Sequence, residues 1–292
     1  MKPAPFKYLV PKTVAETLSH LAKYGDEAKV LAGGQSLVPT MNFRLAQPAV
    51  LIDLNGVSEL FYIRDNNSKG LKIGAMTRQR ELERNAEILK QAPLIPQTMP
   101  FISHPQIRNR GTIGGSLAHA DPSAELPAVM VALEARFCLR SQTGDRWLPA
   151  NDFFVDLFTT ALEPDELLVE IEIPSISPRT HYAFREVARR KGDFALVGVA
   201  VVVKLHQQGI CDKANIVFLS VGNGPVEAKQ AEQFLAGQKP SDRIIQQAAD
   251  LAATKDIDPP ADIHASRNYR RHLAKVLIEQ ALTVAFERAQ SY

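Results

Sequence analysis

Cysteine is scarce in this chain: Cys138 and Cys211 are the only two among its 292 residues. An iron–sulfur cluster takes four cysteine thiolates, so these two cannot hold one by themselves. They also lack CxxC spacing, and we interpret them as reduced core residues of a cytoplasmic protein. Any redox chemistry of this chain therefore requires an organic cofactor.

Long apolar runs and an excess of one charge are missing too. The longest apolar run, Phe194–Val203, is far shorter than the about 20 residues that a membrane-spanning helix needs. The first residues, Met1–Pro5, lack the apolar core of a secretory signal. The 34 basic and 32 acidic residues leave a net charge of +2, which argues against a nucleic-acid partner.

Metal and nucleophile motifs are not recognisable in the sequence. His104 and His119 have no second histidine or carboxylate at metal-ligand spacing. We interpret His104 as structural, whereas His119 suits a structural role and an approach to a ligand equally well. No Ser–His–Asp or Cys–His arrangement stands out. We therefore expect neither a metal site nor a catalytic side chain of the acid–base kind.

The pattern of apolar residues predicts an α+β protein whose main boundary lies near Pro174 and Pro178. Over residues 1–55, short strands alternate with helices, which predicts a small and largely parallel sheet. Thr13 and Glu16 form a capping box that marks the first helix start, and Gly25 suits its end. Strands are predicted at Phe6–Val10, Lys29–Ala32, Val50–Leu54, Leu71–Ala75, Glu134–Arg140 and Leu167–Ile173, with helices at 77–85 and 91–101.

After Arg179 the pattern predicts a three-stranded antiparallel sheet packed on three helices. The three strand candidates are separated or ended by glycine-containing turns, and the last helix is amphipathic. The strands are Tyr182–Ala188, Ala195–Leu205 and Asn215–Val221, and the helices are Val226–Ala236, Asp242–Thr254 and Arg267–Ala289.

A first glycine-rich turn follows a predicted buried strand. Paired glycines can turn sharply and direct consecutive N–H groups into one concavity, and a helix N-terminus reached through such a turn binds anions. We expect Ser36 to cap the next helix, with Pro39 in its first turn. A purely structural tight turn explains the motif about equally well. The turn consists of Ala32, Gly33, Gly34, Gln35, Ser36 and Leu37.

A second glycine-rich turn follows later in the chain. Asp121 and Pro122 after it predict a helix N-cap and first helical residue, although Pro127 requires that helix to kink or to begin later. Two facing turns would suit a pyrophosphate and the long body of a dinucleotide, while two unrelated structural turns remain an alternative. The turn and its continuation contain Gly111, Thr112, Gly114, Gly115, Ser116 and Ala118.

The two turns, together with Arg189–Ala195, resemble motifs of the FAD-binding medium subunit of the molybdenum hydroxylases. This group includes carbon monoxide dehydrogenase, quinoline oxidoreductase and the flavin domain of xanthine dehydrogenase. The resemblance runs essentially from end to end, from Phe6–Tyr8 to Asp262–Arg267. Three ordered motifs at family spacing are far more specific than either glycine turn alone.

The resemblance implies a domain division and a set of cofactor contacts. Residues 1–176 are expected to form a two-part FAD-binding region of the vanillyl-alcohol-oxidase (PCMH) type, with subdomains at about 1–55 and 56–176. Residues 177–292 are expected to form a domain like the carbon monoxide dehydrogenase flavoprotein C-terminal domain. The implied FAD contacts are residues 32–36 and 111–115 at the pyrophosphate, with Leu37, Ser116 and Ala118 beside them, Asp121 at the ribose–phosphate part, and Lys191, Asp193 and Phe194 near the flavin ring.

The function that the resemblance implies is electron transfer. A large partner subunit would carry a molybdopterin cofactor, and a small partner subunit with two 2Fe–2S clusters would pass electrons to FAD on this chain. An external acceptor such as oxygen, NAD⁺ or a quinone would receive them, and the assembly would be a cytoplasmic dimer of heterotrimers. Carbon monoxide dehydrogenase-like subunits have a tyrosine where this chain has Phe194. The alternatives are a self-sufficient FAD oxidase or reductase of the same fold, and an assembly module without a cofactor.

Overall fold

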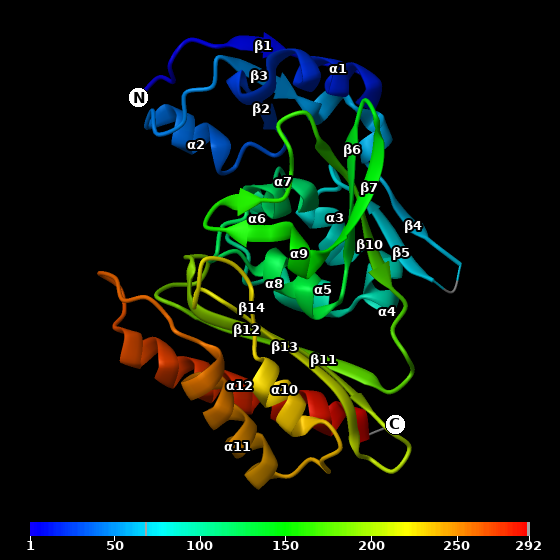
Figure 1. Ribbon diagram of the computed structural model, residues 1–292, viewed down its shortest axis with the longest axis vertical. Coiled ribbons are helices and arrows are strands. Elements are labelled where there is room, and N and C mark those ends of the chain that lie inside the picture. Colours follow the sequence, from blue (N-terminus) through cyan, green and yellow to red (C-terminus); the bar gives the residue numbers. More distant parts are fainter. Residues whose placement is uncertain (68, 291–292) are drawn as a thin grey trace.

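In the computed structural model, which describes residues 1–67 and 69–290, the chain forms three layers along its long axis (Figure 1). The blue N-terminal layer lies at one end, a larger five-stranded sheet with short helices lies in the middle, and a four-stranded sheet with three helices forms the other end. Among the described residues no helix is long and apolar enough to cross a membrane.

The N-terminal layer is a parallel sheet in the order β1-β3-β2, as the alternating pattern predicted. The first helix begins after Thr13, whose hydroxyl accepts a hydrogen bond from the amide of Glu16 at 3.1 Å, and it ends at Gly25 with a φ of +46°. The Glu16 carboxylate completes the cap by accepting from the amide of Lys12 at 2.7 Å. The elements are β1 (Lys7–Leu9), α1 (Val14–Tyr24), β2 (Ala28–Leu31), α2 (Leu37–Asn42) and β3 (Val50–Asp53).

The middle layer is an antiparallel sheet in the order β4-β5-β10-β6-β7. Its two faces bury different groups: Phe137 and Leu139 of β6 pack among the short helices, and Cys138 between them packs against the N-terminal layer. The strands are β4 (Ile63–Asp65), β5 (Gly70–Gly74), β6 (Arg136–Ser141), β7 (Gly144–Pro149) and β10 (Leu167–Pro174). The helices are α3 (Gln79–Arg84), α4 (Ala86–Gln91), α5 (Leu94–Thr98), α6 (Pro105–Arg108), α7 (Ile113–His119), α8 (Glu125–Ala132) and α9 (Ala150–Phe153).

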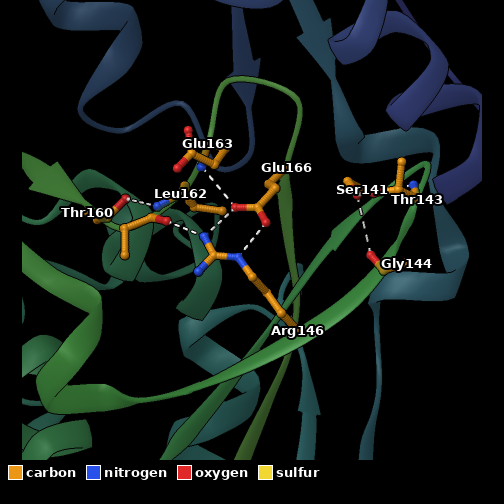
Figure 2. A network of polar contacts seen from close by, with 9 residues as sticks. Ser141, Thr143, Gly144, Arg146, Thr160, Leu162, Glu163 and Glu166 are labelled. Atoms are coloured by element: carbon orange, nitrogen blue, oxygen red, sulfur yellow. Dashed lines mark hydrogen bonds and ion pairs between the residues drawn. The ribbon is translucent and has the colours of Figure 1, made fainter.

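A small hairpin of β8 (Phe154–Asp156) and β9 (Thr159–Thr160) leads into β10 through a loop that Arg146 of β7 anchors (Figure 2). The guanidinium donates to both carboxylate oxygens of Glu166, at 2.6 and 2.7 Å, and to the carbonyl of Ala161. The same carboxylate accepts from the amide of Glu163 at 2.9 Å. A bidentate pair of this kind fixes the loop in one geometry.

The C-terminal layer has four antiparallel strands, so the prediction of three was wrong. Val226 and Glu227 were predicted as the start of a helix, but they pair with Phe218 and Val217 of β13. This pairing covers part of the edge of β13, and the helix begins only at Lys229. The strands are β11 (Thr180–Ala188), β12 (Ala195–Leu205), β13 (Cys211–Leu219) and β14 (Val226–Glu227), and the helices are α10 (Lys229–Leu235), α11 (Asp242–Leu251) and α12 (Arg267–Gln290).

The three helices cover one face of this sheet, and its other face is turned toward the middle layer (Figure 1). Phe184 of β11 belongs to the core of the middle layer, where its ring lies 5.1 Å from that of Phe101 in an edge-to-face arrangement. The amide of Ser220 donates to the carbonyl of Pro122 at 2.9 Å. The C-terminal layer therefore packs directly against the segment that carries the second glycine turn.

Candidate functional site

The two glycine turns lie in backbone contact, although they are far apart in the sequence. A Cβ built on Gly33 would come within 2.4 Å of the carbonyl oxygen of Arg110 and within 2.8 Å of the Cα of Gly111. A Cβ built on Gly115 would lie 3.1 Å from the Cβ of Ala32. Only glycine allows approaches this close, so the structure brings together the two turns that the sequence singled out.

The first turn offers a series of backbone N–H groups. The amides of residues 33 to 37, which precede and begin α2, donate no hydrogen bond to any of the described residues. Gly34 turns the chain with a φ of +74°, and the side chain of Gln35 donates to the carbonyl of Gly33 at 3.0 Å. Successive N–H groups left without an acceptor favour an anion in the concavity between them.

Ser36 does not cap α2 with its side chain, contrary to the prediction. Its backbone is already in the right-handed helical region, with φ −105° and ψ −47°, whereas a side-chain cap needs an extended residue. Its carbonyl instead accepts from the amide and the hydroxyl of Thr40, at 3.1 and 2.8 Å. The N-terminus of α2 therefore receives no side-chain cap from Ser36.

The second turn differs from the first in its hydrogen bonds. The hydroxyl of Thr112 caps α7 by accepting from the amide of Gly115 at 3.0 Å, while the amides of Ile113 and Gly114 donate to the carbonyls of Thr77 and Ala75 at 3.0 and 2.8 Å. A Cβ on Gly114 would lie 2.6 Å from the Cβ of Ala75. The second turn thus provides close packing more than free amides. On α7, Ser116 is half-buried and Ala118 is exposed.

Two side chains that sequence reasoning missed connect the turns. The Nδ2 of Asn55 donates to the carbonyl of Ala32 at 3.1 Å, and its Oδ1 accepts from Arg78 at 2.6 Å. Arg78 also donates to the carbonyl of Arg110. Asn55 and Arg78 belong to no recognisable motif, so no signal in a single sequence marks them.

Asp53, at the end of β3, orients the Asn55 side chain that connects the two turns. Its Oδ1 accepts from the amide of Asn55 at 2.8 Å and from the Asn55 side chain at 2.5 Å, and its Oδ2 accepts from the hydroxyl of Tyr8. Burial opposes ionisation of this carboxyl, but the hydrogen bonds from Tyr8 and Asn55 outweigh it and lower the pKa of Asp53. Asp53 is therefore a charged acceptor at neutral pH.

Asp121 and Pro122 do not begin a helix, so the cap prediction was wrong. α7 ends at His119, its C-cap Ala120 has a φ of +50°, and α8 begins only after Ala124. Asp121 accepts from the amide of Ser123 at 2.8 Å within the connecting turn. The later start resolves the difficulty with Pro127, which falls in the first turn of α8, where a backbone N–H has no helical acceptor.

The third motif forms the loop between β11 and β12. Lys191, Asp193 and Phe194 are exposed, and 71% of the Phe194 surface is accessible. Gly192 has a φ of +87°, and a Cβ there would lie 2.6 Å from the ring of His104. Among the described residues, no hydrogen bond or ion pair joins this loop to the glycine turns, so its place beside a flavin ring stays a prediction.

The other residues considered from the sequence have identifiable surroundings. Arg108 is buried, pairs with Glu83 at 3.4 Å and donates to the carbonyl of Ile102 at 2.9 Å, which makes it structural. Arg110 is exposed, and no ion pair of the described residues includes it. The ring of His119 lies 5.2 Å from that of Phe158. Within the described residues no group of three or more His, Cys, Asp or Glu could hold a metal ion.

Comparisons with known proteins identify the families that this chain matches. The family described as FAD binding domain in molybdopterin dehydrogenase matches residues 4–176, and the CO dehydrogenase flavoprotein C-terminal domain matches residues 182–285. The 6-hydroxypseudooxynicotine dehydrogenase complex subunit alpha of Paenarthrobacter nicotinovorans is 41% identical over 99% of this chain and 97% of the relative.

Two solved structures are similar over nearly the whole chain. One is the carbon monoxide dehydrogenase from Hydrogenophaga pseudoflava that lacks the Mo-pyranopterin moiety of its cofactor, with a TM-score of 0.95, 38% identity and 99% of each chain covered. The other is quinoline 2-oxidoreductase from Pseudomonas putida 86, with a TM-score of 0.93, 39% identity and 99% of each chain covered.

Proposed function

Because the chain belongs to the family of FAD-binding medium subunits of molybdenum hydroxylases, we propose that it binds FAD at the two glycine turns and acts as the electron-transfer subunit of such an enzyme. The observation that carries the proposal is the run of backbone amides from Gly33 to Leu37, which donate no hydrogen bond to any residue that the structure describes. The FAD pyrophosphate supplies the anion that such a run of amides binds.

The residues present fit this cofactor. In our proposal the first turn holds the pyrophosphate through its amides, and the exposed guanidinium of Arg110 adds positive charge beside it. Gly111, Thr112, Gly114 and Gly115 form the facing wall, with Ser116 and Ala118 along α7 and Asp121 at its end. FAD supplies the redox chemistry when bound, and the chain supplies binding, orientation and exclusion of water.

The partners and the electron path extend this proposal. Relatives are called medium chains of carbon monoxide dehydrogenase and of glyceraldehyde dehydrogenase, which supports a multi-subunit assembly for this chain as well. We place the molybdopterin cofactor on a large partner and two 2Fe–2S clusters on a small one, in a dimer of heterotrimers. This subunit then takes electrons from the clusters and passes them to an external acceptor.

The proposal also includes the division into domains and the residues beside the flavin ring. The FAD-binding region, residues 1–176, has the two-part arrangement of the vanillyl-alcohol-oxidase type, and residues 177–292 form the second domain. Lys191, Asp193 and Phe194 lie near the flavin ring, where phenylalanine covers the ring without donating the hydrogen bond that a tyrosine would give.

An absorbance spectrum of the chain, expressed alone and then incubated with FAD, tests the proposal. We expect flavin absorbance that survives gel filtration, and we expect it to be lost in a Gly33→Ala, Gly34→Ala variant that remains folded by circular dichroism. Gly224→Ala is the matched control, because a Cβ there meets only an ordinary contact at 3.7 Å.

Two other outcomes would contradict the proposal. A folded chain that takes up no flavin, alone or in the presence of its partner subunits, would favour an assembly module without a cofactor. Turnover of an organic substrate by the isolated flavin-loaded chain would favour a self-sufficient oxidase or reductase, since such an enzyme needs its own substrate cavity and an acid or base within reach.

A further inference from the structure

Arg78 occupies an unusual position for a half-buried cation. Among the described residues no ion pair includes its guanidinium, which donates to the side chain of Asn55 and to the backbone carbonyl of Arg110. Burial and then the neighbouring charge of Arg110 lower the pKa of Arg78, and the charge of Asp53 only partly offsets them. The two hydrogen bonds of Arg78 are therefore its main polar contacts with the described residues.

Those two hydrogen bonds complete a connection from one glycine turn to the other. Asn55 holds the carbonyl of Ala32 in the first turn at 3.1 Å, and Arg78 holds both Asn55 and the carbonyl of Arg110 that precedes the second turn. The planar guanidinium is suited to this task, because its donors point in fixed directions and can serve two acceptors at once. The ring of Phe61, 5.5 Å away, lies against its other surface.

We propose that Arg78, oriented by Asn55, is a positioning residue that fixes the separation of the two glycine turns before the dinucleotide binds. The proposal rests on the proposed function, since it concerns the same site. Its physical basis is preorganisation: a cradle already held in the bound geometry does not lose conformational freedom when the ligand enters. Asp53 and Tyr8 extend the same network to β1 and make its geometry rigid.

A lysine at position 78 separates this role from a simple effect of charge. Lysine keeps the positive charge but presents a single ammonium group at the end of a flexible chain, so it cannot hold Asn55 and the Arg110 carbonyl in the same fixed geometry. If Arg78 acted only by attracting phosphate, Arg78→Lys would keep most of the affinity for FAD. A positioning role requires that Arg78→Lys behave like Arg78→Ala.

The experiment measures the dissociation constant of FAD by fluorescence titration of the full chain, with the thermal midpoint of each apo variant recorded alongside. The variants are Arg78→Ala, Arg78→Lys, Asn55→Ala and the double variant of Asn55→Ala with Arg78→Ala. Arg64→Ala is the matched control, because Arg64 also lies over an aromatic ring, that of Tyr62 at 4.4 Å, and belongs to β4 away from the turns.

We expect each change at position 78 or 55 to raise the dissociation constant about 10- to 100-fold, which corresponds to the loss of a hydrogen bond with a charged partner. Because both residues act through one connection, the double variant should bind no more weakly than Arg78→Ala. Arg64→Ala should bind FAD as the unchanged protein does. Arg78→Lys should keep the apo thermal midpoint close to that of Arg64→Ala.

Three results would overturn the proposal. Affinity retained in Arg78→Lys would show that charge alone is required, and additive losses in the double variant would show that the two residues act independently. A merely structural role would be shown if every variant that binds FAD more weakly also had a lower apo thermal midpoint, with the two effects in the same order across the variants. If the unchanged protein binds no FAD, the proposed function is refuted. This result is distinguishable from failure of the positioning proposal because it is obtained before any variant is measured.

Discussion

Gly33 and Arg110 lie so close together that no side chain fits between them. A Cβ on Gly33 would be 2.4 Å from the carbonyl oxygen of Arg110, a distance that real Cβ contacts do not reach. The neighbouring Gly34 has a different reason to be glycine, since its φ of +74° lies in the left-handed region and its nearest contacts are flexible side chains at 3.1 and 3.2 Å. The two glycines of one motif therefore serve different physical requirements.

Replacement of Gly33 by alanine is expected to separate the two turns. The added methyl group meets backbone atoms, which cannot rotate away, so the turns must move apart by more than a few tenths of an ångström. We expect Gly33→Ala to weaken FAD binding about tenfold or more, in line with the roughly 1–3 kcal/mol of an overpacked contact. A flavin titration measures this change, with Gly224→Ala as the control that should bind normally.

Thr112 is expected to stabilise α7 through its hydroxyl. It is buried, and its Oγ1 accepts from the amide of Gly115 at 3.0 Å. Removal of an N-cap hydroxyl costs about 1 kcal/mol. Thr112→Ala should therefore lower the unfolding free energy by about that amount in urea denaturation, and Thr112→Ser, which keeps the hydroxyl, should lose less. An alanine variant as stable as the serine variant would contradict the capping role.

Arg270 is expected to contribute strongly to the stability of the C-terminal layer. The guanidinium is buried, donates to the carbonyls of Leu196 and Ser220, and pairs with Asp262 at 2.6 Å. Removing it takes away a donor from two buried carbonyls and the partner of Asp262, so Arg270→Met should cost about 3 kcal/mol. Differential scanning calorimetry measures the effect.

Arg271 provides the control for that experiment. This neighbouring arginine pairs with Asp258 at 2.9 Å, but both side chains are more than a third exposed. Exposed ion pairs contribute about 1 kcal/mol or less. Equal destabilisation by Arg271→Met and Arg270→Met would mean that the buried hydrogen bonds of Arg270 contribute little.

The parts of the fold that sequence predicted well are those with a strong local signal. The capping box at Thr13 and the long apolar run of β12 each depend on residues close together in the chain, and both predictions were confirmed. β14 was missed because two residues are too few to show a period, and its pairing with Val217 and Phe218 depends on a distant strand. The Asp121–Pro122 cap prediction failed because Asp121 accepts from the amide of Ser123, as a helix cap would, but the chain forms only a turn there and α8 begins at Glu125.

The candidate site was predictable only where glycine marks it. Two glycine turns can be recognised in a sequence, but their hydrogen bonding cannot, so the amides taken up by Thr77 and Ala75 became visible only in the structure. Asn55 and Arg78 could not be predicted either. Their roles arise from contacts with backbone carbonyls, which carry no sequence information.

Glu186 is expected to make the stability of the protein fall as pH rises. Its Oε2 is buried and has no hydrogen-bond partner among the described residues. Burial, followed by the charge of Glu125, raises the pKa of Glu186 from 4.5 to about 9. From about pH 4.5 to pH 9 the unfolded chain has lost this proton and the folded protein keeps it. The unfolding free energy should therefore fall with a slope of about 1.4 kcal/mol per pH unit in this window.

The variant Glu186→Gln isolates this effect, because glutamine stays neutral in both states. Burial raises the pKa of Glu125 to about 7, so measurements between pH 8 and 8.5 lie above most of its titration. In that range urea denaturation of the unchanged protein should show the slope, and Glu186→Gln should be less pH-dependent and more stable at pH 8. Glu81→Gln, a change at an exposed position on α3, is the control. A slope that persists unchanged in Glu186→Gln would mean that other groups cause it and that the pKa of Glu186 is not raised in the folded protein.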